Sequence, residues 1–401
     1  MEEILQFNLL RYILLLSFII AGVYLNKRPN SNKYWHFLIP SIVIYSLMEG
    51  LRWMRGADYG YNYAISILKE TSGDIFYDSI AKIFYEVGLP FYFFFIFVSF
   101  VLIFSIFYFV KNYRYAFIPA VILMYSFTMG QSENLMRQYF AISLFLISLK
   151  FFIESKYLFS AIIFILAYLS HSSVLFVIPF VLFYKFIEVK SKHILFILPN
   201  LNYIFLILFL ISLFFSTIIS DFIIGKIVSA DIDIGIADKY LNTNYLNSAT
   251  ELSGSVDSIS VIGFKSSFLN IFRYFIRNLI VILLGYKLVI PENNTANMHS
   301  LKKQISVNKL FLPYCLACSG IIFVSLVPDF EMEVISRLAL YLQIFIFFME
   351  GLIIYQYIVV NKNRRFLYHA IILLVIIECV WIFKVNMGDN WGLHFIWDIQ
   401  I

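Results

Sequence analysis

The sequence predicts an all-α polytopic membrane protein, and three observations support this fold class. Hydrophobic residues make up 61% of the chain and charged residues 14%, whereas a soluble globular domain is about half apolar and about a quarter charged. The apolar residues form long runs, many of them able to cross a hydrocarbon core of ~30 Å as a helix. Basic residues gather in the loops between alternate runs, as they do on the cytoplasmic side of membrane proteins.

The apolar runs define about twelve expected transmembrane helices within one integral membrane domain, residues 1–401. In chain order they cover residues 8–25, 34–48, 89–110, 115–130, 132–153, 157–172, 174–186, 194–220, 266–288, 310–327, 338–359 and 366–386. The first run lacks the basic n-region of a signal peptide, so we expect it to be retained as a span. Cys315 and Cys318 lie inside an apolar run, which favours small core residues over a redox or metal pair.

The orientation follows from Lys and Arg alone. These residues fill the loops 25–33, 111–114, 150–156, 185–192, 287–309 and 362–365, which we therefore place in the cytoplasm, with both termini outside. The net charge of +5 is explained by these loops, so no nucleic-acid partner is expected. Two long polar loops, about 49–88 and 221–265, lie on the outer face and are typical of a lid or substrate-binding loop.

Unusual polar clusters all fall on the outer face in this topology, which indicates a functional site there. Asp58 stands beside Tyr59, and this pair is either part of an ordinary surface loop or a carboxylate and ring that hold a sugar. The clusters are Glu49 to Tyr59, Glu133 to Gln138, His171 to Ser173, Arg273 with Arg277, and Asp329 to Arg337.

Arg137 is the most informative of these residues. A helix that opens at Ser132 would place Arg137 more than one turn inside the membrane, where a charge costs at least about 2.5 kcal/mol unless a cavity, water or an anion meets it. Glu133 and Arg137 share a helix face at i,i+4, as do Asn134 and Gln138. Either Glu133 and Arg137 form an intrahelical ion pair, or Arg137 binds an anionic group such as phosphate while Glu133 orients it.

A predicted helical hairpin that turns at 154–156 brings His171 to the same membrane face as Arg137. From spacing alone, His171 is either an interfacial residue or a general base that works near pH 7.

Three further arginines lie near the start of later spans, and each has two possible roles. Arg273 and Arg277 are four residues apart on one helix, so they either reach to the membrane interface or hold an anion between them. Arg337 either pairs with Glu333 or points inward as Arg137 would.

Four short patches follow one another along the chain: Arg55-Gly56-Ala57-Asp58-Tyr59 with Tyr63, Glu133-Asn134-Leu135-Met136-Arg137-Gln138 with Ala141, His171-Ser172-Ser173 with Pro179, and Ser336-Arg337-Leu338 with Tyr341. In this order they resemble the EpsG-like group of Wzy-type polysaccharide polymerases. The residue before Asp58 is Ala57, where the family often has a small polar residue.

The resemblance implies a polymerase of O-antigen, capsule or exopolysaccharide in the bacterial inner membrane. Such an enzyme joins oligosaccharide repeat units carried on undecaprenyl pyrophosphate at the periplasmic face, without a metal or other cofactor. A flippase and a chain-length regulator are its expected protein partners, beside the lipid bilayer.

Within that chemistry we expect Arg137 and Arg337 to bind the pyrophosphate, with Arg273 or Arg277 assisting. His171 is the candidate base or orients the acceptor hydroxyl. Glu133 positions Arg137 or is itself the base. Five further residues are expected to bind substrate, with Asp58 and Tyr59 contacting sugars: Arg55, Asp58, Tyr59, Asn134 and Gln138.

Two other functions compete with the polymerase. A flippase would also have about twelve spans and buried arginines, but alternating access predicts charges along a path from both faces. A membrane acyltransferase would need a catalytic histidine motif on the cytoplasmic side, and His193, His299 and His369 lie in no comparable motif.

Overall fold

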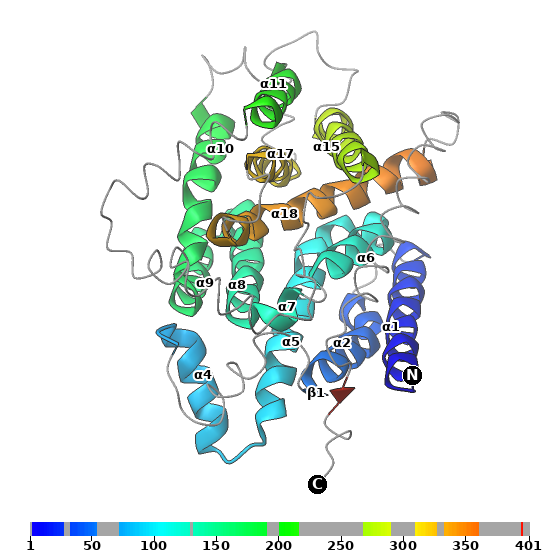
Figure 1. The fold of residues 1–401 in the computed structure, drawn as a ribbon, viewed down its shortest axis with the longest axis vertical. Coiled ribbons are helices and arrows are strands. Elements are labelled where there is room, and N and C mark those ends of the chain that lie inside the picture. Colours follow the sequence, from blue (N-terminus) through cyan, green and yellow to red (C-terminus); the bar gives the residue numbers. More distant parts are fainter. Residues whose placement is uncertain are drawn as a thin grey trace. The chain divides into compact units, whose positions relative to one another are not determined.

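The fold is that of a computed structural model, which describes residues 2–27, 33–53, 72–128, 131–190, 200–215, 268–289, 309–326, 333–360 and 394–395. The described chain is helical (Figure 1), as predicted, apart from a two-residue antiparallel pair between β1 (Arg52–Trp53) and β2 (His394–Phe395). The chain divides into two compact units. The first comprises Met1–Ile178 with Phe347–Ile401, and the second comprises Pro179–Ile346.

Four helical stretches of the described chain are long and apolar enough to cross a membrane: Leu9–Lys27, Phe91–Thr128, Met136–Ile153 and Arg337–Tyr357. Shorter apolar helices cover Tyr157–Ser170, Ser172–Ile187, Leu201–Phe214 and Phe311–Ser325. The 38-residue stretch Phe91–Thr128 departs from helical geometry at Tyr113 (φ −119°, ψ 39°), and it overlaps two of the expected spans, 89–110 and 115–130. The full number of about twelve stays a prediction, and the span expected at 366–386 lies outside the described residues.

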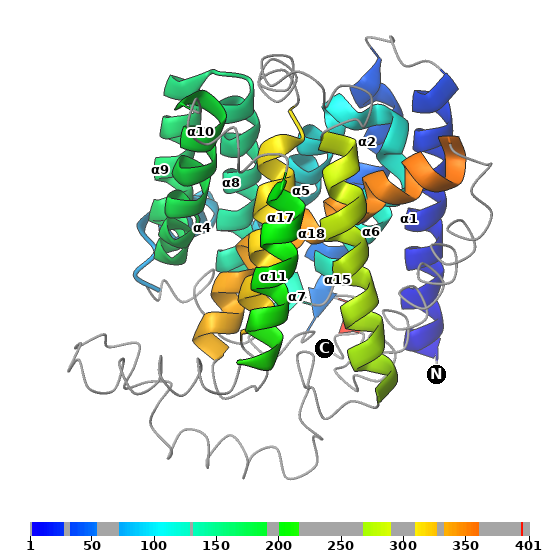
Figure 2. The ribbon, with the colours of Figure 1, turned by 90° about the horizontal axis from the view of Figure 1, so that it is seen from above.

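The first unit is a bundle of helices that pack side by side (Figure 2). α1 packs on α2 and α6, α2 on α5, α5 on α8, and α8 on α9. Its elements are α1 (Glu2–Lys27), α2 (Tyr34–Gly50), α4 (Ile75–Glu86), α5 (Phe91–Val110), a 3-10 helix (Lys111–Ala116), α6 (Phe117–Thr128), α7 (Gln131–Asn134), α8 (Met136–Ile153), α9 (Tyr157–Ser170), a second 3-10 helix (Ser172–Val177) and the last part of α18 (Glu333–Ile354) with its π-helical extension (Tyr355–Val360).

One end of this bundle carries Lys111, Arg114 and Lys150. The hydroxyl of Tyr34 donates to the carbonyl of Phe107 at 2.7 Å, and the guanidinium of Arg114 lies over the Tyr34 ring, with Cζ 4.9 Å from its centroid. Lys150 donates to the carbonyl of Tyr108 at 2.5 Å. These contacts tie together the loops expected in the cytoplasm. At the opposite end α2 and α9 finish, and α5 and α8 begin.

The helix expected from Ser132 onwards is interrupted, which corrects the predicted depth of Arg137. Leu135 has non-helical dihedrals (φ −103°, ψ 45°) and separates α7 from α8. Arg137 therefore lies in the first turn of α8, rather than more than a turn inside one continuous helix. The predicted i,i+4 faces, which join α7 residues to Arg137 and Gln138, cross this break.

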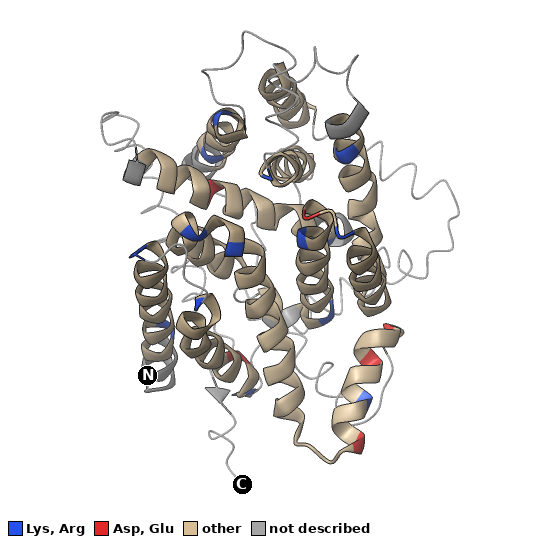
Figure 3. Ribbon diagram, turned by 180° about the vertical axis from the view of Figure 1, so that it is seen from behind, with Lys and Arg blue, Asp and Glu red and all other residues tan. Residues whose placement is uncertain are grey.

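A helix that hydropathy did not predict, α4, lies inside the outer loop expected at 49–88. It has one buried face, with Tyr77 and Ala81, while Lys82 and Glu86 form an exposed i,i+4 pair at 3.7 Å. Figure 3 shows how charged residues mark α4, whereas most helices are tan over most of their length. α4 packs on α5 and α9. Because it is short and carries charges on every turn, its mean apolarity is too low to predict a span.

In the second unit α17 packs against α11 and α15. Cys315 and Cys318 are fully buried free thiols on α17, which confirms the expectation of core residues. The elements of this unit are α10 (Ile178–Lys190), α11 (Leu201–Phe214), α15 (Phe268–Val289), α17 (Phe311–Ser325) and the first part of α18.

Candidate functional site

The hairpin of α8 and α9 brings Arg137 and His171 to the same end of the first unit, as the sequence predicts. The two helices pack on each other, and Ser155 in their connecting turn adopts the left-handed conformation (φ 61°). At the same end α2 approaches α5 closely. A Cβ on Gly50 would lie 2.5 Å from Cα of Ile96, so only glycine fits there.

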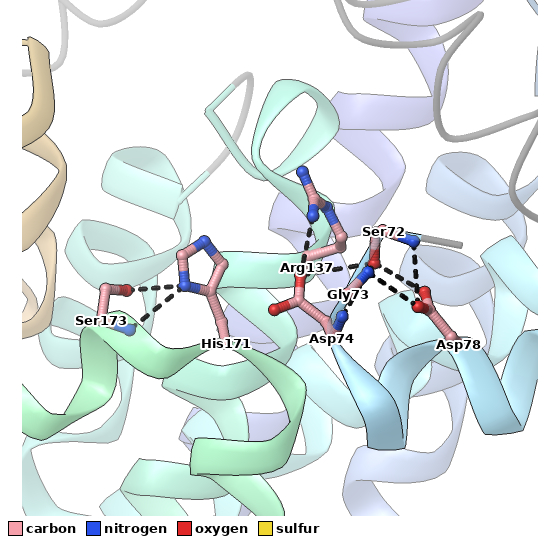
Figure 4. A network of polar contacts seen from close by, with 7 residues as sticks. All are labelled: Ser72, Gly73, Asp74, Asp78, Arg137, His171 and Ser173. Carbon is pink, nitrogen blue, oxygen red and sulfur yellow. Dashed lines mark hydrogen bonds and ion pairs between the residues drawn. The ribbon is translucent and has the colours of Figure 1, made fainter. Parts of the chain in front are cut away.

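Arg137 forms an ion pair with Asp74, a partner that the sequence pattern does not reveal (Figure 4). Nη1 of Arg137 donates to Oδ2 of Asp74 at 2.7 Å. The two side chains are 27% and 16% exposed. A short hydrogen bond between two charged groups is stronger than a neutral one. The pair fastens the start of α8 to the segment before α4.

The carboxylate of Asp78 holds the segment that presents Asp74. It accepts the backbone N–H groups of Ser72 at 2.9 Å and Gly73 at 3.2 Å, and the Ser72 hydroxyl at 2.6 Å. The Ser72 hydroxyl oxygen in turn accepts the backbone N–H of Asp74 at 3.3 Å. Gly73 has φ +85°, a conformation that favours glycine. These bonds fix the direction of the Asp74 side chain before α4 begins.

Burial changes the acidity of Asp74. Desolvation raises the pKa of its carboxyl above the ordinary 3.8, and the charge and hydrogen bond of Arg137 oppose this rise without cancelling it. The negative charge of Asp78 raises the pKa further. Asp74 therefore accepts a proton more readily than an ordinary aspartate, which is the property that acid–base chemistry near neutral pH needs.

His171 lies between α9 and the following 3-10 helix, and its ring bonds to Ser173 (Figure 4). Nδ1 accepts the backbone N–H of Ser173 at 3.3 Å and lies 2.9 Å from its hydroxyl oxygen. Because a backbone N–H only donates, Nδ1 carries the lone pair and Nε2 carries the proton of the neutral imidazole. His171 thus offers an N–H donor at Nε2. This geometry suits donation to an oxygen, and the two expected roles of His171, as general base or as the residue that orients the acceptor hydroxyl, stay predictions.

The other expected site residues are distributed as follows. Arg277 lies on α15, with its guanidinium over the Tyr274 ring at 5.7 Å, and Arg273 is on the same helix, as predicted. Arg337 lies on α18. These arginines belong to the second unit, so their association with Arg137 stays a prediction. Gln138 is buried on α8. The described part of the chain does not include Arg55, Asp58 and Tyr59. It also does not include the side chains of Glu133, Asn134 and Arg273.

One local signal could have located Asp74 as the start of a helix. Ser72 and Asp74 are typical N-terminal residues, and Asp78 adds negative charge in the first turn, before an amphipathic stretch. The pairing with Arg137 has no such signal, because the two residues are 63 positions apart. Among the residues described, no three His, Cys, Asp or Glu side chains gather as metal ligands.

The comparisons with known proteins agree with the sequence patches. Neither the curated proteins nor the solved structures gave a significant match. The EpsG family, which is linked to polysaccharide biosynthesis, matches residues 34–394, a range that includes every candidate site residue above. Because this match covers most of the chain, the protein belongs to the EpsG family.

Proposed function

We propose that the protein is a polysaccharide polymerase that joins oligosaccharide repeat units carried on undecaprenyl pyrophosphate. The observation that supports this most is the Arg137–Asp74 pair at the end of the first unit opposite its basic loops. The positive-inside rule assigns the basic end to the cytoplasm, so the pair would face the periplasm of a bacterial inner membrane. Membership of a family linked to polysaccharide biosynthesis supports the same substrate class.

The proposed reaction transfers a glycan from its lipid carrier. A sugar hydroxyl of the acceptor unit attacks C1 of the sugar that bears the donor's pyrophosphate. The bond between C1 and the pyrophosphate oxygen breaks, and its electrons leave with undecaprenyl pyrophosphate. Negative charge grows on the leaving group, so the site must stabilise it. The planar guanidinium of Arg137 suits this role because it donates parallel hydrogen bonds to phosphate oxygens.

Asp74 is the proposed acceptor of the hydroxyl proton. When pyrophosphate binds Arg137, its negative charge offsets part of the positive charge that otherwise stabilises the Asp74 carboxylate. The carboxylate then loses part of this compensation, which raises its pKa further and strengthens it as a base. His171 would donate from Nε2 to an oxygen of the pyrophosphate or of a sugar. Arg337, Arg273 and Arg277 stay candidate ligands of the pyrophosphate, and the outer loops would bind sugars.

The first test is a glycan gel from a host strain that lacks this protein. We expect single-repeat surface glycan in the deletion strain and in strains restored with Arg137→Ala, and a full ladder with the wild type. Arg114→Ala is the matched control, because Arg114 lies at the basic end of the same bundle and should leave the ladder intact. Membrane levels of all variants are matched before the gels are compared.

Two other outcomes would change the conclusion. Loss of every surface repeat in the deletion strain would indicate an exporter of lipid-linked oligosaccharide and would exclude a polymerase. A normal ladder with Arg137→Ala would keep the polymerase, but it would return Arg137 to a purely structural ion pair.

A further inference from the structure

A buried tyrosine hydroxyl lies beside the Arg137–Asp74 pair. Tyr77 follows Asp74 by three residues on α4 and is fully buried. Its ring packs edge-on against Phe94 and Phe140, with centroids 5.1 and 5.8 Å away. Phe140 stands nearly one turn after Arg137 on α8, so the Tyr77 ring lies close to the ion pair.

The Tyr77 hydroxyl finds no hydrogen-bond partner among the described residues. Burying a hydroxyl without such a partner is costly, and folded proteins leave few buried polar groups unsatisfied. A phenylalanine would make the same ring contacts without that cost. Ring packing therefore does not explain why this residue has a hydroxyl. A bound ligand could accept the hydrogen bond that this hydroxyl can donate.

Arg52 adds a buried positive charge to that of Arg137. It follows the end of α2, is 2% exposed, and its Cζ lies 5.1 Å from the centroid of the Phe95 ring. Burial raises the pKa of the Tyr77 hydroxyl, and the positive charges of Arg137 and Arg52 both oppose this rise. Both guanidinium groups are therefore within electrostatic reach of the same hydroxyl.

We propose, resting on the proposed function, that Arg52 and the Tyr77 hydroxyl complete an anion site with Arg137 and bind the pyrophosphate of the lipid-linked substrate. A pyrophosphate carries more than one negative charge, and Arg137 already compensates Asp74, so a second arginine is needed for charge balance. The hydroxyl gains the hydrogen bond that it lacks by donating to a phosphate oxygen. Buried donors that are already in place stabilise a growing negative charge without reorganisation.

Tyr77→Phe tests this proposal, because it removes the hydroxyl and keeps the ring contacts. The full-length protein is purified in lipid nanodiscs, and binding of undecaprenyl pyrophosphate is followed by the shift in thermal unfolding. We expect the affinity to fall about tenfold, as the loss of one hydrogen bond to a charged group predicts. The unfolding temperature without ligand should not fall. Arg52→Gln should weaken binding at least as much.

Tyr34→Phe is the matched control at the basic end of the bundle. It removes the hydrogen bond to the Phe107 carbonyl, so it should lower the unfolding temperature without ligand while leaving the affinity unchanged. Inorganic pyrophosphate should compete with undecaprenyl pyrophosphate for the wild type, since the site recognises the headgroup. Lack of competition would mean that the lipid chain alone binds, and it would overturn the proposal.

The remaining outcomes separate this proposal from the proposed function. If Arg137→Ala abolishes binding while Tyr77→Phe binds as the wild type does, the assignment of Tyr77 is wrong and the polymerase stands. If the wild type does not bind undecaprenyl pyrophosphate, both proposals fall. Arg52 is so buried that Arg52→Gln could fail to fold, and Tyr77→Phe then decides alone.

Discussion

Replacing Arg137 with alanine should destabilise the protein as well as stop polymerisation. The substitution removes a 2.7 Å charged hydrogen bond and leaves the Asp74 carboxylate, which is only 16% exposed, without its positive partner. A hydrogen bond to a charged group contributes about 1.5–3 kcal/mol. Arg137 is 27% exposed, so solvent screens part of its charge, and we expect the free energy of unfolding to fall by about 2 kcal/mol.

A second substitution separates stability from activity. Asp74→Asn in the Arg137→Ala background removes the uncompensated carboxylate, so the double variant should recover about half or more of the lost stability. Polymerisation should stay absent, because the double variant lacks both the proposed pyrophosphate ligand and the proposed base.

Four proteins form one double-mutant cycle: the wild type, Arg137→Ala, Asp74→Asn and the double variant. Urea unfolding of the purified proteins in detergent gives the four stabilities, and the glycan ladder reports activity. A double variant no more stable than Arg137→Ala would show that Arg137 does not compensate Asp74. A restored ladder in the double variant would refute the proposed role of Arg137 in catalysis.

Three further predictions follow from the same region of the first unit. The free energy of unfolding of the wild type relative to Asp74→Asn should fall as pH rises. Because folding raises the pKa of Asp74, its contribution to stability is complete below the ordinary pKa of 3.8 and is lost as pH rises through the raised pKa. A difference that stays constant from about pH 3 to 8 would contradict the raised pKa. Gly50→Ala should lower the free energy of unfolding by about 1–3 kcal/mol, since its Cβ meets the Ile96 backbone, and chemical unfolding of the purified variant measures this. His171→Gln should keep part of the polymerisation rate that His171→Ala loses, because its side-chain amide can donate from a position close to Nε2; equal rates would favour a base instead.

The sequence predicts those parts of the fold that depend on apolarity and on local turns. Hydropathy locates the long helices α1, α5 and α8, and the turn that contains Ser155 follows from a polar break between two apolar runs. The placement of Arg137 and His171 at one end then follows from the geometry of a hairpin. No hydropathy signal marks α4, because its charged residues recur on each turn.

The contacts of the site depend on tertiary structure, so the sequence does not reveal them. Helix spacing is visible in the sequence and predicts Glu133 beside Arg137, which stays a prediction because the Glu133 side chain lies outside the described residues. The ion pair of Arg137 with Asp74 joins residues 63 positions apart and has no such signal. The break at Leu135 likewise has no signal in composition, since leucine favours a helix.

The position of the two partners on their helices supports the proposal that Arg137 binds both Asp74 and the pyrophosphate. Arg137 lies in the first turn of α8, where the positive end of the helix dipole adds to its charge. Asp74 immediately precedes α4, whose N-terminus stabilises a carboxylate in the same way. Nη1 of Arg137 donates to Asp74. In the proposed reaction the guanidinium would therefore hold the leaving group close to the proposed base. Such an arrangement keeps the base close to the reacting centre throughout the transfer, which is how positioning lowers a barrier.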